Sequence, residues 1–340
     1  MKKGLLLMAT ILMVGIIPLL AQTAIKRTTE VFSIVGKDTL MMDVYENPTT
    51  EVKESGRPVM LYIHGGGFNM GSRINAAQQV YFHYLADQGW LVASMDYRLA
   101  GVSTNEDGSV NNPYNVSSTN DAIRYACIDA VSATNYLLSQ TKWQINPKQI
   151  ALGGGSAGAI TALQLEYDLC NGETYTNLLP SGFNYAGIVS QAGCICTNEE
   201  TLHWNKKPCP MMLMHGSEDY TVPQHVGDLL DCRGIGTEEI VLQLKEMEVP
   251  YWRFISKGAD HVIAMLSLTS YLEEQYRFLT DYVIGGLQGS VNTVVEDKEP
   301  ANMQSLEMMV KYVPLYIVGY GQYLENLDFS NLPVPDKIRY

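Results

Sequence analysis

Two hydrophobic patterns alternate along most of the chain. Continuous apolar runs, such as residues 59–63 and 91–95, are followed by longer segments in which apolar residues recur every three or four positions, such as residues 76–88 and 121–138. Continuous apolar runs are typical of buried parallel strands, and the longer spacing is typical of amphipathic helices. From Val59 to Val283 the alternation therefore predicts an α/β fold, with a mostly parallel central sheet and helices on both faces.

Other segments fit the same scheme. Glu30–Ile34 and Thr39–Tyr45 flank a Gly-Lys-Asp turn and are predicted to form a hairpin at the edge of the sheet. The remaining expected strands are residues 150–152, 185–191, 210–214 and, as the last strand, 251–255. The remaining expected helices are residues 159–169, 237–247 and 262–283. Polar stretches at residues 100–120, 171–184 and 192–207 are predicted to be loops that wall a pocket, because long loops in compact domains are often functional.

The two ends of the chain depart from this alternation. Met1-Lys2-Lys3, an apolar run over residues 4–20 and Ala21 have the composition of a signal peptide. The alternative is a membrane anchor, but Pro18 and the small residue before Gln22 favour cleavage. We therefore expect a signal peptide at residues 1–21, a catalytic domain at 22–285 and a C-terminal extension of unknown role at 286–340. The mature protein is expected to be exported, periplasmic or secreted, with no stable membrane insertion.

Charge and cysteine content exclude some partners. The net charge is -13 and no Lys/Arg cluster stands out, so we expect no nucleic-acid partner. All six cysteines follow the predicted signal peptide, which permits disulfides. A pair between Cys194 and Cys209 is the first candidate, and free buried thiols are the alternative. Cysteine spacing does not match a zinc site, so no metal is expected.

A glycine-rich turn between a predicted strand and a predicted helix carries the strongest candidate for chemistry. The run Gly154-Gly155-Ser156-Ala157-Gly158 fits the pattern G-x-S-x-G, in which a serine stands at a sharp strand-to-helix turn. Small neighbours leave room for a strained backbone at the serine. Since similar turns also occur in nucleotide-binding and purely structural sites, Ser156 needs a base and an acid elsewhere in the chain.

An acid and a base for Ser156 follow it along the chain in the expected order. A serine hydroxyl needs a histidine to take its proton and a carboxylate to orient that histidine. With this turn the chain order is serine, acid, histidine. Asp219 follows the expected strand 210–214, and His261 follows the expected strand 251–255. We predict Ser156 as nucleophile, Asp219 as acid and His261 as base.

Neighbouring residues compete for these roles. Glu218 is the competing acid, although Asp219 is favoured. His225 also follows the serine, but it lies close to Asp219 in the sequence and is predicted to begin a helix. Asp260 is expected to be a turn or capping residue rather than the acid.

A second glycine run follows the expected strand 59–63. The glycines of His64-Gly65-Gly66-Gly67 let the backbone approach a ligand and direct N–H groups at it. In lipases and esterases an H-G-G-G run contributes to the oxyanion hole, together with the N–H of the residue after the nucleophile, here Ala157. His64 itself is expected to hold the loop.

Taken as a set, these motifs resemble the α/β-hydrolase fold serine esterases. Within that fold the chain resembles the H-G-G-G carboxylesterases, including hormone-sensitive-lipase-like enzymes and bacterial feruloyl and acetyl-xylan esterases. The resemblance extends roughly from Val31 to Val283 and includes the run Asp96-Tyr97-Arg98-Leu99. The acid segment, His215 to Pro223, is more similar to that of dienelactone hydrolases and prolyl peptidases. The resemblance implies Ser156, His261 and Asp219 as the catalytic triad and the N–H groups of Gly66, Gly67 and Ala157 as oxyanion donors.

These features predict a serine-dependent carboxylic-ester hydrolase that forms an acyl-enzyme and needs no cofactor. The expected partner is a small-molecule or carbohydrate-linked ester, and the resemblance implies acetyl or feruloyl esters of plant polysaccharide. One alternative is a prolyl-type serine peptidase, for whose usual extra domain the chain length leaves little room. Another is an inactive hydrolase-fold binding protein, which would have no need to keep all three residues.

Overall fold

A computed structural model describes residues 25–296 except 102, 105–109, 112–113 and 115. The predicted signal peptide and residues 297–340 of the predicted extension lie outside the described residues. In the described part, none of the helices has the length and apolar character needed to cross a membrane.

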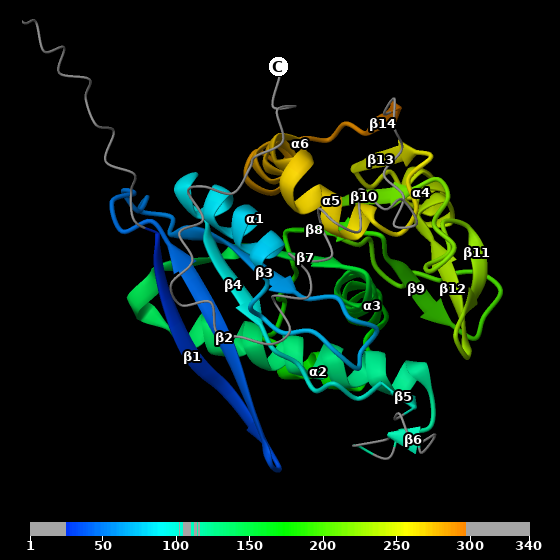
Figure 1. The fold of residues 1–340 in the computed structure, drawn as a ribbon. Helices are drawn as coiled ribbons and strands as arrows, with labels where there is room; N and C mark the ends of the chain where they lie inside the picture. Colours follow the sequence, from blue (N-terminus) through cyan, green and yellow to red (C-terminus); the bar gives the residue numbers. More distant parts are fainter. Residues whose placement is uncertain (1–24, 102, 105–109, 112–113, 115, 297–340) are drawn as a thin grey trace, which may run out of the picture.

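A nine-stranded sheet forms the centre of the molecule (Figure 1), in the order β1-β2-β4-β3-β7-β8-β10-β13-β14. The first three strands of this order pair antiparallel, and all other neighbours pair parallel, as the alternating pattern predicts. The strands are β1 (Lys26–Val35), β2 (Asp38–Glu46), β3 (Arg57–Ile63), β4 (Leu91–Met95), β7 (Ile145–Gly155), β8 (Gly187–Gln191), β10 (Met211–Gly216), β13 (Tyr251–Lys257) and β14 (Val291–Glu296). The hairpin expected at the edge, β1 and β2, is confirmed.

Helices cover both faces of the sheet and bury two separate cores. On one face lie α2 (Thr119–Ser139), α3 (Ala157–Asn171) and α4 (Thr237–Glu246); on the other lie α1 (Ala76–Asp87), α5 (Ile263–Ser270), α6 (Leu272–Phe278) and the π-helical segment η3 (Leu279–Ile284). Strand β3 contributes side chains to both cores. Leu61 and Ile63 belong to the first and Met60 and Tyr62 to the second, because successive side chains of a strand point to opposite faces.

Five expectations need correction. Residues 251–255 are not the last strand, because β14, inside the stretch assigned to the extension, pairs parallel with β13. The expected loop 192–207 contains β9 (Cys194–Thr197), which joins β11 (Val226–Leu229) and β12 (Cys232–Gly236) in a small antiparallel sheet. His225 therefore precedes a strand and does not begin a helix. The expected loop 100–120 also contains a short hairpin, β5 (Ser103–Thr104) and β6 (Val110–Asn111), and the loop 171–184 contains the 3₁₀ helix η2 (Thr174–Leu178); a further 3₁₀ turn is η1 (Thr141–Trp143).

The predicted pairing of Cys194 with Cys209 is wrong. In the reduced state that the structure shows, all six cysteines are buried free thiols, which was the alternative. The two residues lie in different surroundings: Cys194 packs against Gly234 of β12, whereas the backbone N–H of Cys209 donates to Glu166 of α3 at 2.7 Å.

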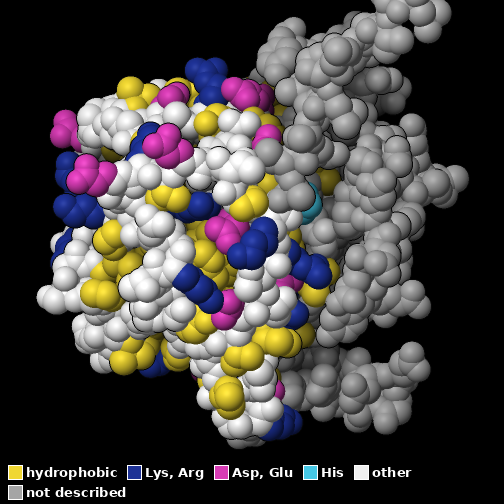
Figure 2. All heavy atoms as spheres, turned by 90° about the vertical axis from the view of Figure 1, so that its left-hand side faces the viewer, with side chains coloured by type: hydrophobic (Ala, Val, Ile, Leu, Met, Phe, Trp, Pro, Cys, Tyr) yellow, Lys and Arg dark blue, Asp and Glu magenta, His cyan; other side chains and the backbone are white. Residues whose placement is uncertain are grey.

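Surface charges of both signs are mixed. Figure 2 shows the face that carries β1, where basic and acidic side chains are interspersed. Several of them form ion pairs, including Lys142 with Glu30 at 2.5 Å and Lys26 with Glu46 at 3.2 Å. These charged side chains are thus paired locally across neighbouring elements.

Glu166 gives a stability prediction. Its side chain is buried on α3; one oxygen accepts the N–H of Cys209, and the other has no partner among the described residues. Burial raises the pKa of Glu166 above its ordinary value. A raised pKa in the folded state means that stability is lost as pH rises above the unfolded value of about 4.3. Glu166→Gln should therefore raise the melting temperature by about 2 to 4 °C at pH 8 and leave it unchanged at pH 4.

Calorimetry at the two pH values tests this expectation. The exposed Glu173, on the turn after the same helix, provides the control, because Glu173→Gln should change neither value. If Glu166→Gln changed the melting temperature equally at both pH values, the raised pKa of Glu166 in the folded protein would be contradicted.

Candidate active site

Ser156 stands at the sharp turn between β7 and α3. Its backbone has φ 54° and ψ −121°, a conformation that is strained for a residue with a side chain. The turn is held by the N–H of Ser156, which donates to the carbonyl of Gln191 at 2.9 Å. Gly158 allows the helix to approach β3, since a Cβ there would lie 1.9 Å from the carbonyl oxygen of Ile63. The predicted strand-turn-helix is confirmed.

The structure brings the three predicted triad residues into one hydrogen-bonded chain. Nε2 of His261 lies 2.8 Å from Oγ of Ser156, and Nδ1 of His261 lies 2.8 Å from Oδ2 of Asp219. A carboxylate only accepts hydrogen bonds, so Nδ1 carries the imidazole proton. Nε2 is then bare and accepts from the serine hydroxyl, which is the arrangement a general base requires.

The loop after β10 fixes the carboxylate of Asp219. Oδ1 accepts the backbone N–H groups of Thr221 at 2.9 Å and Val222 at 3.0 Å, and the side chain is fully buried. Burial alone would raise the pKa of Asp219, but the hydrogen bonds from His215 and His261 outweigh it and hold that pKa well below its usual range. Asp219 is therefore ionised throughout the physiological pH range.

His215 contacts the same carboxylate oxygen of Asp219 as His261. Its Nε2 lies 3.3 Å from Oδ2 of Asp219 and 3.1 Å from the carbonyl oxygen of Val222. Because both neighbours are acceptors, Nε2 carries a proton and donates it. Nδ1 lies 2.9 Å from Oγ1 of Thr237 at the start of α4. This role was not predicted from the sequence, although His215 lies at the end of a buried strand, four residues before the acid, which is a usable signal.

We expect His215→Phe to lower kcat about tenfold, because it removes one donor to the triad acid. Loss of that donor also raises the pKa of Asp219, so the carboxylate stabilises protonated His261 more strongly. The acid limb of the profile of kcat/KM against pH should therefore move to higher pH. Ester hydrolysis measured from pH 4 to 9 tests both effects.

Two variants control this prediction. His215→Gln keeps an N–H donor and should restore most of the activity. His225→Gln changes an exposed histidine, 70% accessible in its side chain, and should have no effect. If the acid limb of the pH profile were unchanged in His215→Phe, His215 would contribute only to packing and not to the properties of Asp219.

The glycine loop after β3 lies directly beside the nucleophile. A Cβ on Gly65 would lie 3.3 Å from Cβ of Ser156. Gly66 has φ 127°, and a Cβ there would lie 2.1 Å from the carbonyl oxygen of Met70, so only glycine fits. Ala157 is the first residue of α3, where backbone N–H groups have no acceptor within the helix. The positions of Gly66, Gly67 and Ala157 suit the predicted donor role, which stays a prediction.

Residues 64 and 96–98 hold this loop in place. His64 is buried, its ring stacks on Tyr97 at 4.4 Å, and its carbonyl accepts the Tyr97 hydroxyl at 3.0 Å. Asp96 pairs with Arg73 at 2.6 Å, and Arg98 forms a buried ion pair with Asp129 of α2 at 2.7 Å. These contacts agree with the expectation that His64 holds the glycine loop in place.

The competing residues take other positions. The side chain of Glu218 is exposed, and that of Asp260 accepts the N–H of Val262 at 2.9 Å, ahead of α5. His225 lies 3.6 Å from Glu239, away from the triad. Within the described residues, no group of three or more His, Cys, Asp and Glu side chains could hold a metal ion.

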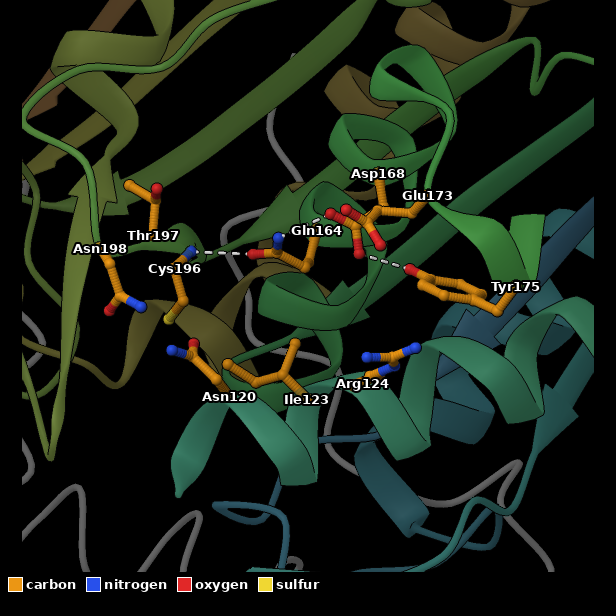
Figure 3. A pocket seen from close by; sticks show the side chains of 10 residues that line it. All are labelled: Asn120, Ile123, Arg124, Gln164, Asp168, Glu173, Tyr175, Cys196, Thr197 and Asn198. Carbon is orange, nitrogen blue, oxygen red and sulfur yellow. Dashed lines mark hydrogen bonds between the residues drawn. The ribbon is translucent and has the colours of Figure 1, made fainter. Parts of the chain in front are cut away.

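A polar pocket of about 210 Å³ lies elsewhere, between α2, α3, η2 and β9 (Figure 3). In its wall Asp168 accepts hydrogen bonds from Gln164 at 2.9 Å and from Tyr175 at 2.5 Å. None of the triad residues lines it, so it is separate from the candidate active site.

The sequence and the fold were compared with those of known proteins. The family model described as BD-FAE matches residues 42–178, which include the glycine loop and the serine turn. A structure of Thermogutta terrifontis esterase 2 superposes with a TM-score of 0.55 at 20% identity, covering 77% of this chain and 93% of that one. The chain has the α/β-hydrolase fold. Another structure of that esterase, phosphorylated by paraoxon, matches with a TM-score of 0.53 at 19% identity, covering 77% of this chain and 95% of that one.

Curated relatives of this α/β-hydrolase-fold chain match over shorter segments. Gut esterase 1 of Caenorhabditis briggsae is 25% identical over 170 residues, 49% of this chain and 28% of that protein. Lysophosphatidylserine lipase ABHD12 of Danio rerio is 26% identical over 204 residues, 52% of this chain and 47% of that protein. The chain thus spans less than half the length of these two relatives.

Proposed function

We propose that this α/β-hydrolase is a serine-dependent carboxylic-ester hydrolase that acts through an acyl-enzyme. The observation that carries the proposal is the hydrogen-bonded chain from Ser156 through His261 to Asp219, with both separations at 2.8 Å. A serine hydroxyl in this arrangement becomes a nucleophile at neutral pH because its proton has a base to go to.

The reaction proceeds in two halves. In the first, Oγ of Ser156 attacks the ester carbonyl while Nε2 of His261 takes its proton. The protonated imidazole then gives that proton to the leaving alcohol, and an acyl-serine remains. In the second half a water molecule loses its proton to His261 and attacks the acyl-serine, which releases the carboxylic acid. Asp219 stays ionised and stabilises the protonated imidazole in both halves.

Negative charge on the carbonyl oxygen needs donors close to the serine. The N–H groups of Gly66, Gly67 and Ala157 are the proposed donors, supported by the contact of the glycine loop with the serine turn. The N-terminus of α3 adds a partial positive charge at the same place. Each such donor typically contributes about 3 kcal/mol to the transition state.

Acetyl or feruloyl esters of carbohydrates are the proposed substrates, and the mature protein is proposed to be exported. The substrate class is supported by the resemblance of the motifs to feruloyl and acetyl-xylan esterases. Export is supported by the composition of residues 1–21. No metal or organic cofactor takes part in the proposed reaction.

A matched substrate panel tests the proposal. Purified protein is assayed with p-nitrophenyl acetate, an acetylated xylo-oligosaccharide and a feruloylated arabinose, and with proline p-nitroanilides as the amide counterparts. We expect hydrolysis of the esters, with kcat/KM at least about 100-fold above that for the amides. Preferential amide cleavage would indicate a peptidase, and no hydrolysis of any substrate would indicate a binding protein.

A further inference from the structure

Three thiols lie on one face of the small sheet formed by β11, β12 and β9. Cys194 and Cys196 are two residues apart in β9, so both side chains point to the same face. Antiparallel pairing sets Cys196 opposite Gly234 and Cys194 opposite Gly236 of β12. Cys232 precedes Gly234 by two residues and therefore shares that face.

The positions of the sulfur and Cβ atoms together favour one pair. Sγ of Cys196 and Sγ of Cys232 lie 2.8 Å apart, whereas a disulfide bond measures about 2.05 Å. Residue 234, opposite Cys196, has no side chain to separate the two sulfurs. The other neighbour, Cys194, is in the same strand, where side chains two residues apart are about 6.6 Å apart, too far for the ~4 Å between Cβ atoms that a disulfide needs.

We propose that Cys196 and Cys232 form a disulfide that links β9 to β12. The thiolate of Cys196 attacks one sulfur of a small disulfide oxidant and releases one thiol. The thiolate of Cys232 then attacks the mixed disulfide at Cys196 and releases the second thiol. Both cysteines lose a proton, their two sulfurs are oxidised, and the oxidant is reduced to two thiols. Cys196 also lines the pocket in Figure 3, which places it next to solvent.

This bond would secure the segment that carries the triad acid. The two cysteines are 36 positions apart, and the loop they close contains β10, His215 and Asp219. Strand β12 leads directly to Thr237, the partner of His215. The turn between β11 and β12 is already fixed to α2, because Asp231 accepts the N–H of Thr119 at 2.9 Å. A covalent link here limits the freedom of the acid segment in the unfolded chain.

The oxidation step belongs to folding rather than to the finished fold. Hydrogen bonding to Cys196, and then burial, raises the pKa of the Cys232 thiol. The hydrogen bond to Cys194 is the largest of the effects that raise the pKa of Cys196. Thiolate is therefore scarce in the folded protein, and exchange is faster while the strands are still assembling.

Refolding in a redox buffer tests the proposal. The full chain is unfolded in urea and refolded in mixed 2-mercaptoethanol and 2-hydroxyethyl disulfide. Remaining thiols are blocked with iodoacetamide in denaturant, and the protein is digested and mapped by mass spectrometry. We expect four blocked thiols and one linked pair of peptides, containing Cys196 and Cys232. The oxidised protein should melt about 5 to 10 °C above the reduced protein.

Variants identify the pair. Cys232→Ala should abolish the linked peptides, whereas Cys194→Ala should leave them. Cys127→Ala, which changes a buried thiol on α2, is the matched control and should also leave them. Six blocked thiols, or a bond between any other two cysteines, in the refolded wild-type protein would overturn the proposal. This map does not depend on ester hydrolysis, so its failure is distinguishable from failure of the proposed function.

Discussion

Ser156→Ala is expected to lower kcat for p-nitrophenyl acetate by about 10⁴-fold or more. The substitution removes the Oγ that lies 2.8 Å from Nε2 of His261 and leaves no atom to form the acyl-enzyme. Among the described residues the serine side chain has no other hydrogen bond on which the turn depends: the backbone N–H of residue 156 holds the turn by donating to the carbonyl of Gln191. Steady-state kinetics on the purified variant measures the loss.

The control shows that the loss is chemical. Thermal unfolding should give Ser156→Ala a melting temperature close to that of the wild-type protein. Ser181→Ala, which changes an exposed serine, should retain full activity. Hydrolysis by Ser156→Ala at a rate near that of the wild-type protein would mean that another group is the nucleophile.

Asp219→Asn is expected to lower kcat about 10⁴-fold, nearly as much as Ser156→Ala. An asparagine amide can donate to Nδ1 of His261, which moves the imidazole proton to Nε2. Nε2 then no longer accepts the proton of Ser156. Initial rates with p-nitrophenyl acetate measure the effect. Glu218→Gln and Asp260→Asn change the two neighbouring acids and should each keep at least about half of the wild-type kcat.

Asp219→Asn should also change how the melting temperature depends on pH. The pKa of Asp219 is depressed in the folded protein, so its contribution to stability is present above the unfolded value of about 3.9 and is lost as pH falls below it. The melting temperatures of the wild-type protein and Asp219→Asn should therefore differ most near neutral pH, and the difference should shrink steadily as pH falls from about 4 toward the depressed pKa of the folded protein. A larger loss from Glu218→Gln than from Asp219→Asn would contradict the assignment of the acid.

The sequence predicts the centre of this fold well because the centre is built from strong local patterns. A buried parallel strand such as β3 must be apolar on both sides, and a serine turn needs small neighbours at fixed positions. The order of Ser156, Asp219 and His261 along the chain then indicates which strand ends meet. All three positions depend on motifs of fewer than ten residues.

Features that depend on long-range pairing were missed. Strand β14 follows the glycines at 285 and 286, and its exposed side chains lack the apolar pattern of a central strand. Strand β9 has only four residues, and its pairing with β12 brings together cysteines 36 positions apart. Sequence spacing suggested Cys194 and Cys209 instead, because no local pattern encodes which thiols face each other. The role of His215 is not encoded locally for the same reason, since it depends on Thr237 and on the fold of the acid loop.

The most direct test of the account is covalent labelling of the nucleophile. Diethyl p-nitrophenyl phosphate reacts with an activated serine: Oγ bonds to phosphorus and p-nitrophenolate leaves. We predict one equivalent of p-nitrophenolate per chain, loss of ester hydrolysis in proportion, and a diethylphosphoryl group on the peptide that contains Ser156, with no labelling of Ser156→Ala or of heat-unfolded protein. Labelling of a different residue, or full ester hydrolysis by protein stoichiometrically labelled at Ser156, would contradict it.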